Sequence, residues 1–289
     1  MPLKKNLTEV NMPELPEVET IKTAIEKSIG KTNIIKVSIN NKNLREKIPD
    51  DLATKVQGAG IIRYRRRAKY IIISLDNGLS LIWHLGMSGR VKISESMPPL
   101  VKHDHIVIET GNGVIVYNDA RRFGLFTYCS TENLEQHRFF CKMGIEPFDE
   151  NLTPAYLAEK LKNKKVPIKI ALLDQNIITG IGNIYASEAL YLAGILPDRT
   201  AASLSAGECG KLIESVISVL KQAIAAGGST LKDYQKPDGS LGYFQNMHCV
   251  YNKTGQKCPH CNCNVNRTGG IRKTVLGGRS TFFCPVRQK

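Results

Sequence analysis

The hydrophobic periodicity of this chain changes near Glu146-Pro147-Phe148-Asp149. Before that point, apolar residues alternate or run continuously over short segments separated by turn signals such as Asp76-Asn77-Gly78 and Gly111-Asn112-Gly113. Such runs predict antiparallel strands joined by hairpins, and a set of them indicates a β-sandwich or flattened barrel. The predicted strands are 34–39, 70–75, 79–85, 105–109 and 114–117.

Helical spacing of apolar residues marks the rest of the chain and one segment at its start. Behind Pro13, a predicted buried helix repeats its apolar residues until Gly30. Beyond residue 146 helices dominate, and the clearest covers 205–226. Ser205 and Glu208 there form a capping box, and Gly227-Gly228 ends the helix. We interpret its apolar stripe as core packing.

These patterns predict an α+β protein of several domains. Its 289 residues exceed a typical single domain. We expect a β-sandwich with a leading helix over 13–135, a helical domain over 146–240 and a small β-hairpin unit over 245–289. No apolar run approaches the length of a membrane span, and the first residues lack a secretory signal, so we expect a cytoplasmic protein without a membrane role.

The charge balance is strongly basic. Forty Lys and Arg residues against twenty-six Asp and Glu give a net charge of +14. A polyanion such as nucleic acid is the natural partner, although charge alone does not separate this from a generally basic proteome.

Four of the eight cysteines lie within the last 32 residues, at Cys258, Cys261, Cys263 and Cys284. In a chain without export signals this clustering favours a zinc site over disulfides. Strand-like segments at 249–251 and 281–283 flank the cysteines, which predicts a metal-held β-hairpin.

Several motifs together resemble one family, the bacterial formamidopyrimidine-DNA glycosylases, over nearly the whole chain from Met12 to Lys289. The resemblance implies a helix-two-turns-helix DNA clamp, a terminal zinc finger, and a monomer that removes oxidised purines from duplex DNA in base-excision repair. The matching motifs are Pro13-Glu14-Leu15-Pro16-Glu17-Val18-Glu19-Thr20, Arg66-Arg67-Ala68-Lys69-Tyr70, His84-Leu85-Gly86-Met87-Ser88-Gly89, Lys102-His103-Asp104-His105, Arg121-Arg122-Phe123-Gly124, Gly180-Ile181-Gly182-Asn183-Ile184-Tyr185-Ala186 and Gly278-Arg279-Ser280-Thr281-Phe282-Phe283-Cys284.

By this resemblance Pro13 is the nucleophile, whose free secondary amine attacks the sugar C1′ and forms a Schiff base. Glu14 is the general acid, with Glu17 as a supporting carboxylate. Lys69 contacts the damaged nucleotide and transfers a proton in the strand-cleaving lyase step. Without the resemblance, the two carboxylates would be read as stabilising the helix dipole, and Lys69 as part of a solvated edge strand.

The resemblance also implies the residues that contact DNA. Met87, Arg121 and Phe123 fill the space that a flipped base leaves, and Arg121 can pair with the orphaned cytosine. Asn183, at the start of a predicted helix 184–193, is expected to hold a phosphate together with backbone donors. Arg279 binds phosphates beside the lesion and assists δ-elimination. His103 and Lys164 match further DNA contacts.

Two features depart from the family pattern. Eleven residues precede Met12, and while residues remain attached to Pro13 its nitrogen is a tertiary amide that cannot attack. We therefore expect Met12 to be the true initiator, with residues 1–12 absent from the mature protein. In addition, Arg287 stands where a fourth cysteine of the finger is expected. We hypothesise that Cys258, Cys261, Cys263 and Cys284 hold one zinc ion.

Two alternatives remain open. Relatives of the endonuclease VIII type remove oxidised pyrimidines, but those begin Pro-Glu-Gly-Pro, whereas Leu15 occupies the third position here. The other alternative is a non-catalytic DNA-binding homologue, made inert by the leader and the altered finger. It would bind duplex DNA with strong salt dependence and would not cleave it.

Overall fold

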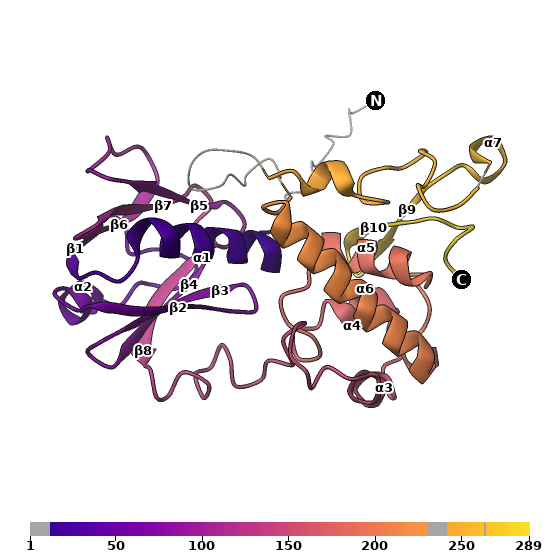
Figure 1. The fold of residues 1–289 in the computed structure, drawn as a ribbon, viewed down its shortest axis with the longest axis horizontal. Coiled ribbons are helices and arrows are strands. Elements are labelled where there is room, and N and C mark those ends of the chain that lie inside the picture. The colour runs from indigo at the N-terminus through magenta and orange to yellow at the C-terminus, as the bar shows by residue number, and fades with distance from the viewer. Residues whose placement is uncertain (1–11, 230–241, 263) are drawn as a thin grey trace, which may run out of the picture.

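The computed structural model describes residues 12–229, 242–262 and 264–289, and it has two halves joined by an irregular connection (Figure 1). The first half holds the strands β1 (Ile34–Ile39), β2 (Ile61–Arg67), β3 (Tyr70–Leu75), β4 (Leu79–His84), β5 (Gly89–Ser94), β6 (Asp104–Thr110), β7 (Gly113–Asp119) and β8 (Leu125–Ser130), with helices α1 (Leu15–Ile29) and α2 (Leu52–Val56). The second holds α3 (Pro154–Leu161), α4 (Ile168–Leu172), α5 (Asn183–Ala193), α6 (Ala206–Ala225), α7 (Val265–Thr268), the short 3-10 turns Ala201–Ser203 and Phe244–Met247, and the hairpin β9 (Arg272–Leu276) and β10 (Arg279–Phe283).

The strands of the first half form two antiparallel four-stranded sheets, ordered β1-β6-β7-β5 and β2-β3-β4-β8. All five strands predicted from alternation are present, and the glycine-containing turns connect β3 to β4 and β6 to β7, as predicted. The expected β-sandwich with a leading helix is therefore confirmed.

One apolar core unites both sheets with α1. Val18, Ile21, Ile25 and Ile29 of α1 are buried in it. The helical spacing of these residues places them along one stripe, so the remaining face of the helix stays outside the core. Trp83 of β4 packs edge-on against Tyr117 and Phe126, from β7 and β8.

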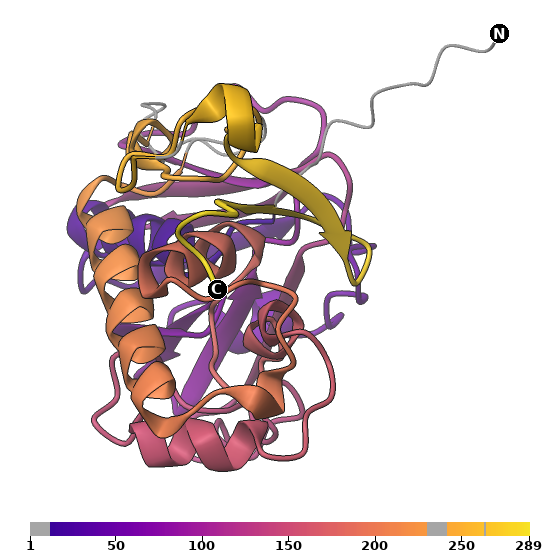
Figure 2. The same cartoon turned by 90° about the vertical axis from the view of Figure 1, so that its right-hand side faces the viewer.

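The second half packs helices α3 to α6 around a separate core. Helix α6 begins with the predicted capping box: Glu208 N donates to Ser205 Oγ at 3.3 Å, and Glu208 Oε2 accepts from Ser205 N at 2.9 Å. It ends at Ala225, before Gly227 and Gly228, which adopt positive φ. Figure 2 shows α5 beside α6, with the β9–β10 hairpin lying across α5.

The predicted strand at 249–251 is wrong. The N–H groups of Cys249, Val250 and Tyr251 all donate to the carboxylate of Glu188, on α5, at 2.7 to 3.0 Å. A buried side chain thus binds the amides that a strand ladder would use, and apolar pattern alone does not reveal such a partner.

None of the helices in the described ranges combines the length and the apolar character needed to cross a bilayer.

Candidate functional site

A cavity of about 350 Å³ lies where the two halves meet. Residues from both halves line it, so its shape depends on how the halves dock. Its walls contain several residues predicted to act in chemistry or DNA binding. The lining residues are Met12, Glu14, Lys69, Met87, Leu173, Ile181, Gly182, Asn183, Gly278, Arg279 and Ser280.

Glu14 joins the two halves at the base of this cavity. Its carboxylate accepts hydrogen bonds from the backbone N–H groups of Gly182 at 2.8 Å and Ile184 at 3.0 Å, with a longer contact from Tyr185 N at 3.4 Å. These amides belong to the first turn of α5, whose positive end favours an anion. A Cβ on Gly182 would lie 2.3 Å from the Glu14 carboxyl carbon, so only glycine allows this approach.

These contacts correct one expectation. The N–H groups of Gly182, Ile184 and Tyr185 bind Glu14, so they are not donors for a DNA phosphate. The anion at this helix start is a side chain of the protein itself.

Glu17 is buried behind Glu14 and is fully hydrogen-bonded. Its carboxylate accepts from Tyr185 Oη at 2.6 Å, from Ser229 N at 2.7 Å and from Glu14 N at 2.9 Å. The Ser229 hydroxyl in turn lies 3.0 Å from Nε2 of the buried His248. Glu17 therefore fixes the backbone of Glu14 and links it to α5.

The two carboxylates have raised pKa values. Burial raises the pKa of Glu14, which the charge of Lys69 and the amides of α5 partly offset. Burial and the neighbouring Glu14 raise the pKa of Glu17 to about 7. A raised pKa lets a buried carboxyl group keep its proton to higher pH and deliver it, which is the requirement for a general acid.

Lys69 enters the cavity from the turn between β2 and β3. Burial lowers the pKa of its ammonium group and the charge of Arg279 adds to that effect, whereas Glu14 and Glu17 oppose it. The lysine is thus no solvated member of an edge strand. It faces the carboxyl pair with an amine that gives up its proton more readily than an exposed lysine does.

Asn183 anchors the hairpin to the cavity wall. Its Nδ2 donates to Ser280 O at 3.0 Å and to Tyr251 Oη at 3.2 Å. Its Oδ1 accepts from Lys169 Nζ at 2.7 Å, and Lys169 also donates to Ser280 O and to Thr281 Oγ1. The exposed Arg279, next to Ser280, is thereby held at the cavity rim.

Sequence reasoning did not identify Lys169. Its side chain is fully buried although lysine is mostly exposed in proteins. The residue type alone gives no signal, because the partners come from α5 and β10, far along the chain.

Met87, Arg121 and Phe123 lie on two loops joined by the buried carboxylate of Asp119. Asp119 accepts from Ser88 Oγ at 2.5 Å and from Gly124 N at 2.7 Å, so it binds the residue after Met87 and the residue after Phe123. A Cβ on Gly86 would lie 2.4 Å from the backbone of the 123–124 segment, which shows how closely the two loops pack. Sequence reasoning did not identify Asp119 either.

Arg121 and Phe123 are exposed on this loop, and the Arg121 guanidinium lies 5.0 Å from the Phe123 ring centre. His103 has a φ of 74° and its loop joins the same cluster, because Asp119 N donates to His103 O at 3.1 Å. Three of the loops predicted to contact DNA are therefore connected through one aspartate.

The remaining predicted residues lie at the edges of the site. Pro13 is buried between Met12, which lines the cavity, and Glu14. Lys164 lies outside the lining of the cavity and pairs with Asp174 at 3.0 Å.

The terminal cysteines converge as predicted. The sulfur atoms of Cys258, Cys261 and Cys284 all lie within 4.8 Å of one another, and those of Cys261 and Cys284 are 3.7 Å apart. Three thiols at this spacing suit a thiophilic metal ion such as zinc. Cys263 lies outside the described residues.

Arg287, at the position where a fourth cysteine is expected, points to α5 instead. Its Nε donates to Tyr191 O and its Nη2 to Leu192 O, each at 3.1 Å, and the guanidinium lies over the Tyr191 ring. A cation at the carboxyl end of a helix satisfies its last carbonyl groups and complements its dipole.

Comparisons with known proteins agree with this geometry. Residues 12–126 match the family model of the formamidopyrimidine-DNA glycosylase N-terminal domain, and residues 143–235 match that of the formamidopyrimidine-DNA glycosylase H2TH domain. The formamidopyrimidine-DNA glycosylase of Rickettsia bellii is 46% identical over 279 residues, covering 96% of this chain and 100% of the relative. That of Rhodospirillum rubrum is 43% identical over 285 residues, with the same coverage.

Solved structures show the same relationship. A Lactococcus lactis FPG variant in complex with Fapy-dG-containing DNA superposes with a TM-score of 0.87 at 35% identity, covering 96% of this chain and 100% of that one. The Lactococcus lactis Fpg complex with abasic-site DNA gives a TM-score of 0.86 at 34% identity, covering 96% and 99%. The chain spans the full length of these proteins and carries both family domains: it is a member of the formamidopyrimidine-DNA glycosylase family of DNA-repair enzymes.

Proposed function

We propose that this protein excises 8-oxoguanine and formamidopyrimidines from duplex DNA through a Schiff base on Pro13, and then cleaves the strand by β,δ-elimination. The observation that carries the proposal is the cavity lined by Glu14, Lys69 and Arg279. Glu14 directly follows Pro13 in the chain. Relatives of this family have been solved with DNA that contains Fapy-dG or an abasic site, which correspond to a formamidopyrimidine substrate and to the product of base removal.

In the proposed reaction the Pro13 amine attacks C1′, and the C1′–O4′ bond breaks as Glu14 protonates the ring oxygen. The base then leaves with the proton that the amine has lost, and the C1′–Pro13 bond becomes an iminium. Proton removal from C2′ then expels the 3′ phosphate, and a second elimination expels the 5′ phosphate. Lys69, with its lowered pKa, is placed to move protons in these steps. Arg279 at the rim is placed to bind the phosphates that leave.

A flipped nucleotide leaves a gap in the duplex. We propose that Met87, Arg121 and Phe123 fill it, since their loops are joined and two of these side chains are exposed. His103, Lys164 and Asn183 are proposed to contact the DNA backbone, and Asn183 also anchors the hairpin that carries Arg279.

The chemistry requires a free amine on Pro13, so the proposed active form begins at that residue. Borohydride trapping on an 8-oxoguanine duplex tests this with a matched pair, the protein that begins at Pro13 and the same protein with residues 1–12 attached. We expect a covalent adduct and strand cleavage from the first form alone. Lesion-DNA binding without an adduct from either form would support the non-catalytic homologue instead.

We propose zinc as the metal of the terminal hairpin. Cys258, Cys261 and Cys284 supply three thiolates, and Cys263 is proposed as the fourth. Bound zinc would tie the base of the β9–β10 hairpin together, and the residues of the hairpin would then hold Arg279 at the rim. Metal analysis of the purified protein tests this, and the absence of stoichiometric zinc would contradict it.

Oxidised pyrimidines are a second candidate substrate class. The Lactococcus lactis Fpg has also been solved with oxidised-pyrimidine-containing DNA, at 35% identity to this chain. A panel that compares 8-oxoguanine with an oxidised pyrimidine under identical conditions decides between the two. We expect faster excision of the purine.

A further inference from the structure

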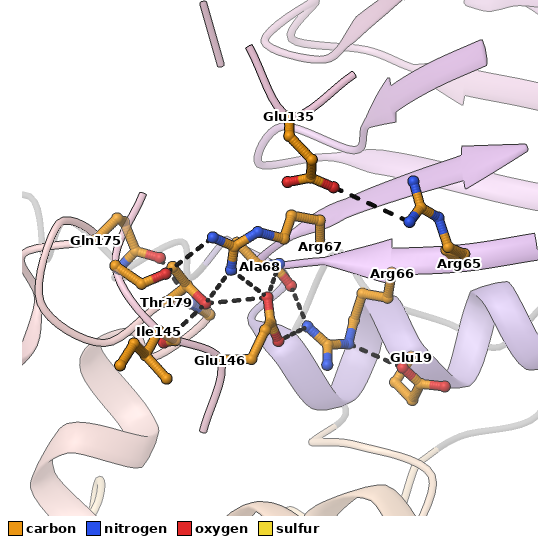
Figure 3. A network of polar contacts seen from close by, with 12 residues as sticks. Glu19, Arg65, Arg66, Arg67, Ala68, Glu135, Ile145, Glu146, Gln175 and Thr179 are labelled. Carbon is orange, nitrogen blue, oxygen red and sulfur yellow. Dashed lines mark hydrogen bonds and ion pairs between the residues drawn. The ribbon is translucent and has the colours of Figure 1, made fainter. Parts of the chain in front are cut away.

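We propose that Glu146, in the connection between the two halves, is a positioning residue for Lys69. Its carboxylate fixes the β2–β3 turn that carries the lysine and holds that turn against the segment leading to α5. This inference rests on the role proposed for Lys69. Figure 3 shows Glu146 at the centre of a polar network formed by both halves.

The β2–β3 turn is strained at Ala68, and both the N–H and the carbonyl of that residue are hydrogen-bonded. β2 ends at Arg67 and β3 begins at Tyr70, so the connection consists of Ala68 and Lys69. Ala68 has a φ of 52°, a left-handed conformation that costs an alanine free energy. Its N–H donates to Glu146 Oε1 at 2.6 Å, and its carbonyl accepts from Arg66 Nη1 at 3.0 Å. The backbone directly before Lys69 is therefore held in place.

Two arginines hold the carboxylate in turn. Arg66 Nη1 lies 2.6 Å from Glu146 Oε2, and Arg67 Nη1 lies 2.9 Å from Oε1. The Arg66 side chain is 9% exposed and also donates to Glu19 of α1 at 2.8 Å. Burial opposes the charge of Glu146, but Arg66, the Ala68 amide and Arg67 outweigh it, so the pKa of Glu146 is lowered. Both oxygens therefore act as acceptors.

The same carboxylate also binds the segment of the second half that leads to α5. Thr179 Oγ1 donates to Glu146 Oε1 at 3.0 Å. The carbonyl of the next residue, Gly180, accepts from Leu15 N at 3.1 Å, and Leu15 directly follows Glu14 in the chain. Glu146 thus connects the turn that carries Lys69 with the segment that positions Glu14. A shift of the carboxylate would move Lys69 relative to its partner in the reaction.

A neighbouring ion pair provides a matched control. Arg65, on the same strand, lies 4.0 Å from Glu135, whose side chain is 64% exposed (Figure 3). The amide of the lysine turn, Ala68 N–H, donates to Glu146 and not to Glu135. Glu135→Gln therefore removes an ion pair of the strand that precedes Lys69 without loosening the turn, and we expect strand cleavage at the wild-type rate.

The test is a double-mutant cycle on a duplex with a preformed abasic site, where strand cleavage does not depend on base excision. The proteins compared are the parent, Glu146→Gln, Lys69→Ala and the double variant, all with the same amino terminus. Misplacement of a catalytic group by about 1 Å costs on the order of a hundredfold. We expect single-turnover cleavage by Glu146→Gln to fall by roughly tenfold to a hundredfold, and the double variant to be no slower than Lys69→Ala alone.

Additive losses would overturn the inference, because Glu146 would then act independently of Lys69. An unchanged rate for Glu146→Gln would overturn it as well. If Lys69→Ala cleaves at the parent rate, it is the proposed role of the lysine that fails, and the two failures are thereby distinguished. Should Glu146→Gln not fold, Thr179→Val removes a single bond to the carboxylate, and the same cycle with Lys69→Ala is then decisive.

The pH profile gives a second readout. The parent rate is expected to follow the titration of Lys69, whose pKa burial lowers. Glu146→Gln should shift that limb of the profile, because the lysine moves relative to the carboxyl pair. A fall in rate at all pH values with an unshifted limb would contradict positioning of Lys69.

Discussion

The carboxylate of Glu14 lies 168 residues from Gly182 in the sequence and 2.8 Å from its backbone nitrogen. The side chain proposed as the general acid therefore also accepts hydrogen bonds from the backbone amides at the amino terminus of α5. The acid is positioned by the second half of the protein, and the nucleophile proposed at Pro13 directly precedes it in the chain.

Glu14→Gln should abolish base excision and leave lesion binding nearly intact. Glutamine keeps the shape of the side chain but cannot deliver the proton, and general acid catalysis is worth about a hundredfold or more. Single-turnover excision and fluorescence anisotropy on the same 8-oxoguanine duplex measure the two properties. Glu26→Gln, at the other end of α1, is the control and should excise normally. Normal excision by Glu14→Gln would remove the acid role.

Glu17 should make stability fall as the pH rises. Its pKa is about 7 in the folded protein and 4.5 ordinarily. Below pH 4.5 Glu17 is protonated in both the folded and the unfolded protein. As the pH rises above 4.5 the unfolded protein releases this proton first, so the free energy of unfolding falls. The loss amounts to roughly 3 kcal/mol once the pH has passed the folded pKa of about 7. Glu17→Gln cannot titrate, so thermal unfolding of the pair between pH 4.5 and 7.5 isolates this term. Parallel pH profiles for the two proteins would contradict the raised pKa.

Arg121→Ala should relax the preference for cytosine opposite the lesion. A lost guanidinium contact to a base edge costs about 1–3 kcal/mol of discrimination, while cleavage at a preformed abasic site should change less. The measurement is the ratio of excision rates for 8-oxoguanine opposite cytosine and opposite adenine. Arg122→Ala, on the same exposed loop, should keep the parent ratio. Equal ratios for all three proteins would show that the opposite base is read elsewhere.

Cys284→Ser should lower both the zinc content and the affinity for DNA. The residue directly follows β10, so the loss of metal there would loosen the hairpin that carries Arg279. We expect close to one zinc per chain in the parent and substantially less in the variant, measured by elemental analysis. Cys141→Ser changes an exposed thiol far along the chain from the cluster and should retain the metal. Equal zinc in both variants would place the metal elsewhere.

Arg287→Ala should destabilise the second half of the protein. Its bonds to Tyr191 O and Leu192 O satisfy carbonyl groups at the end of α5. Hydrogen bonds to a charged group contribute about 1.5–3 kcal/mol, and urea unfolding should detect a loss of this size. Arg267→Ala, at an exposed position in α7, should unfold like the parent. An unchanged midpoint for Arg287→Ala would mean that packing alone holds the hairpin to α5.

Local patterns predicted the elements whose cause is local. The strand 70–75 and the helix behind Ser205 are predictable because a continuous apolar run and a capping box involve only neighbouring residues. The family resemblance supplied Glu14 and Lys69, which the structure brings to one cavity. Their roles in catalysis stay predictions.

Long-range partners account for what the sequence did not reveal. Lys169, Asp119 and Glu188 are buried charged residues that organise the hairpin, the loops and the 249–251 segment. Each binds groups far away in the chain, and no spacing rule connects such pairs. The incorrect strand at 249–251 has the same origin, because Glu188 binds the amides on which a strand would depend.

Helix α1 belongs to two cores at once. Leu15, its first residue, is buried with Ile181 and Ile184 of the second half, while Val18 and the residues after it are buried between the sheets. If the chain were divided between the two halves, each fragment would carry an incomplete core. Helix α1 would have to dock onto the second half again before Glu14 could bind the amides of α5. Fragment complementation should therefore restore strand cleavage and the fold together.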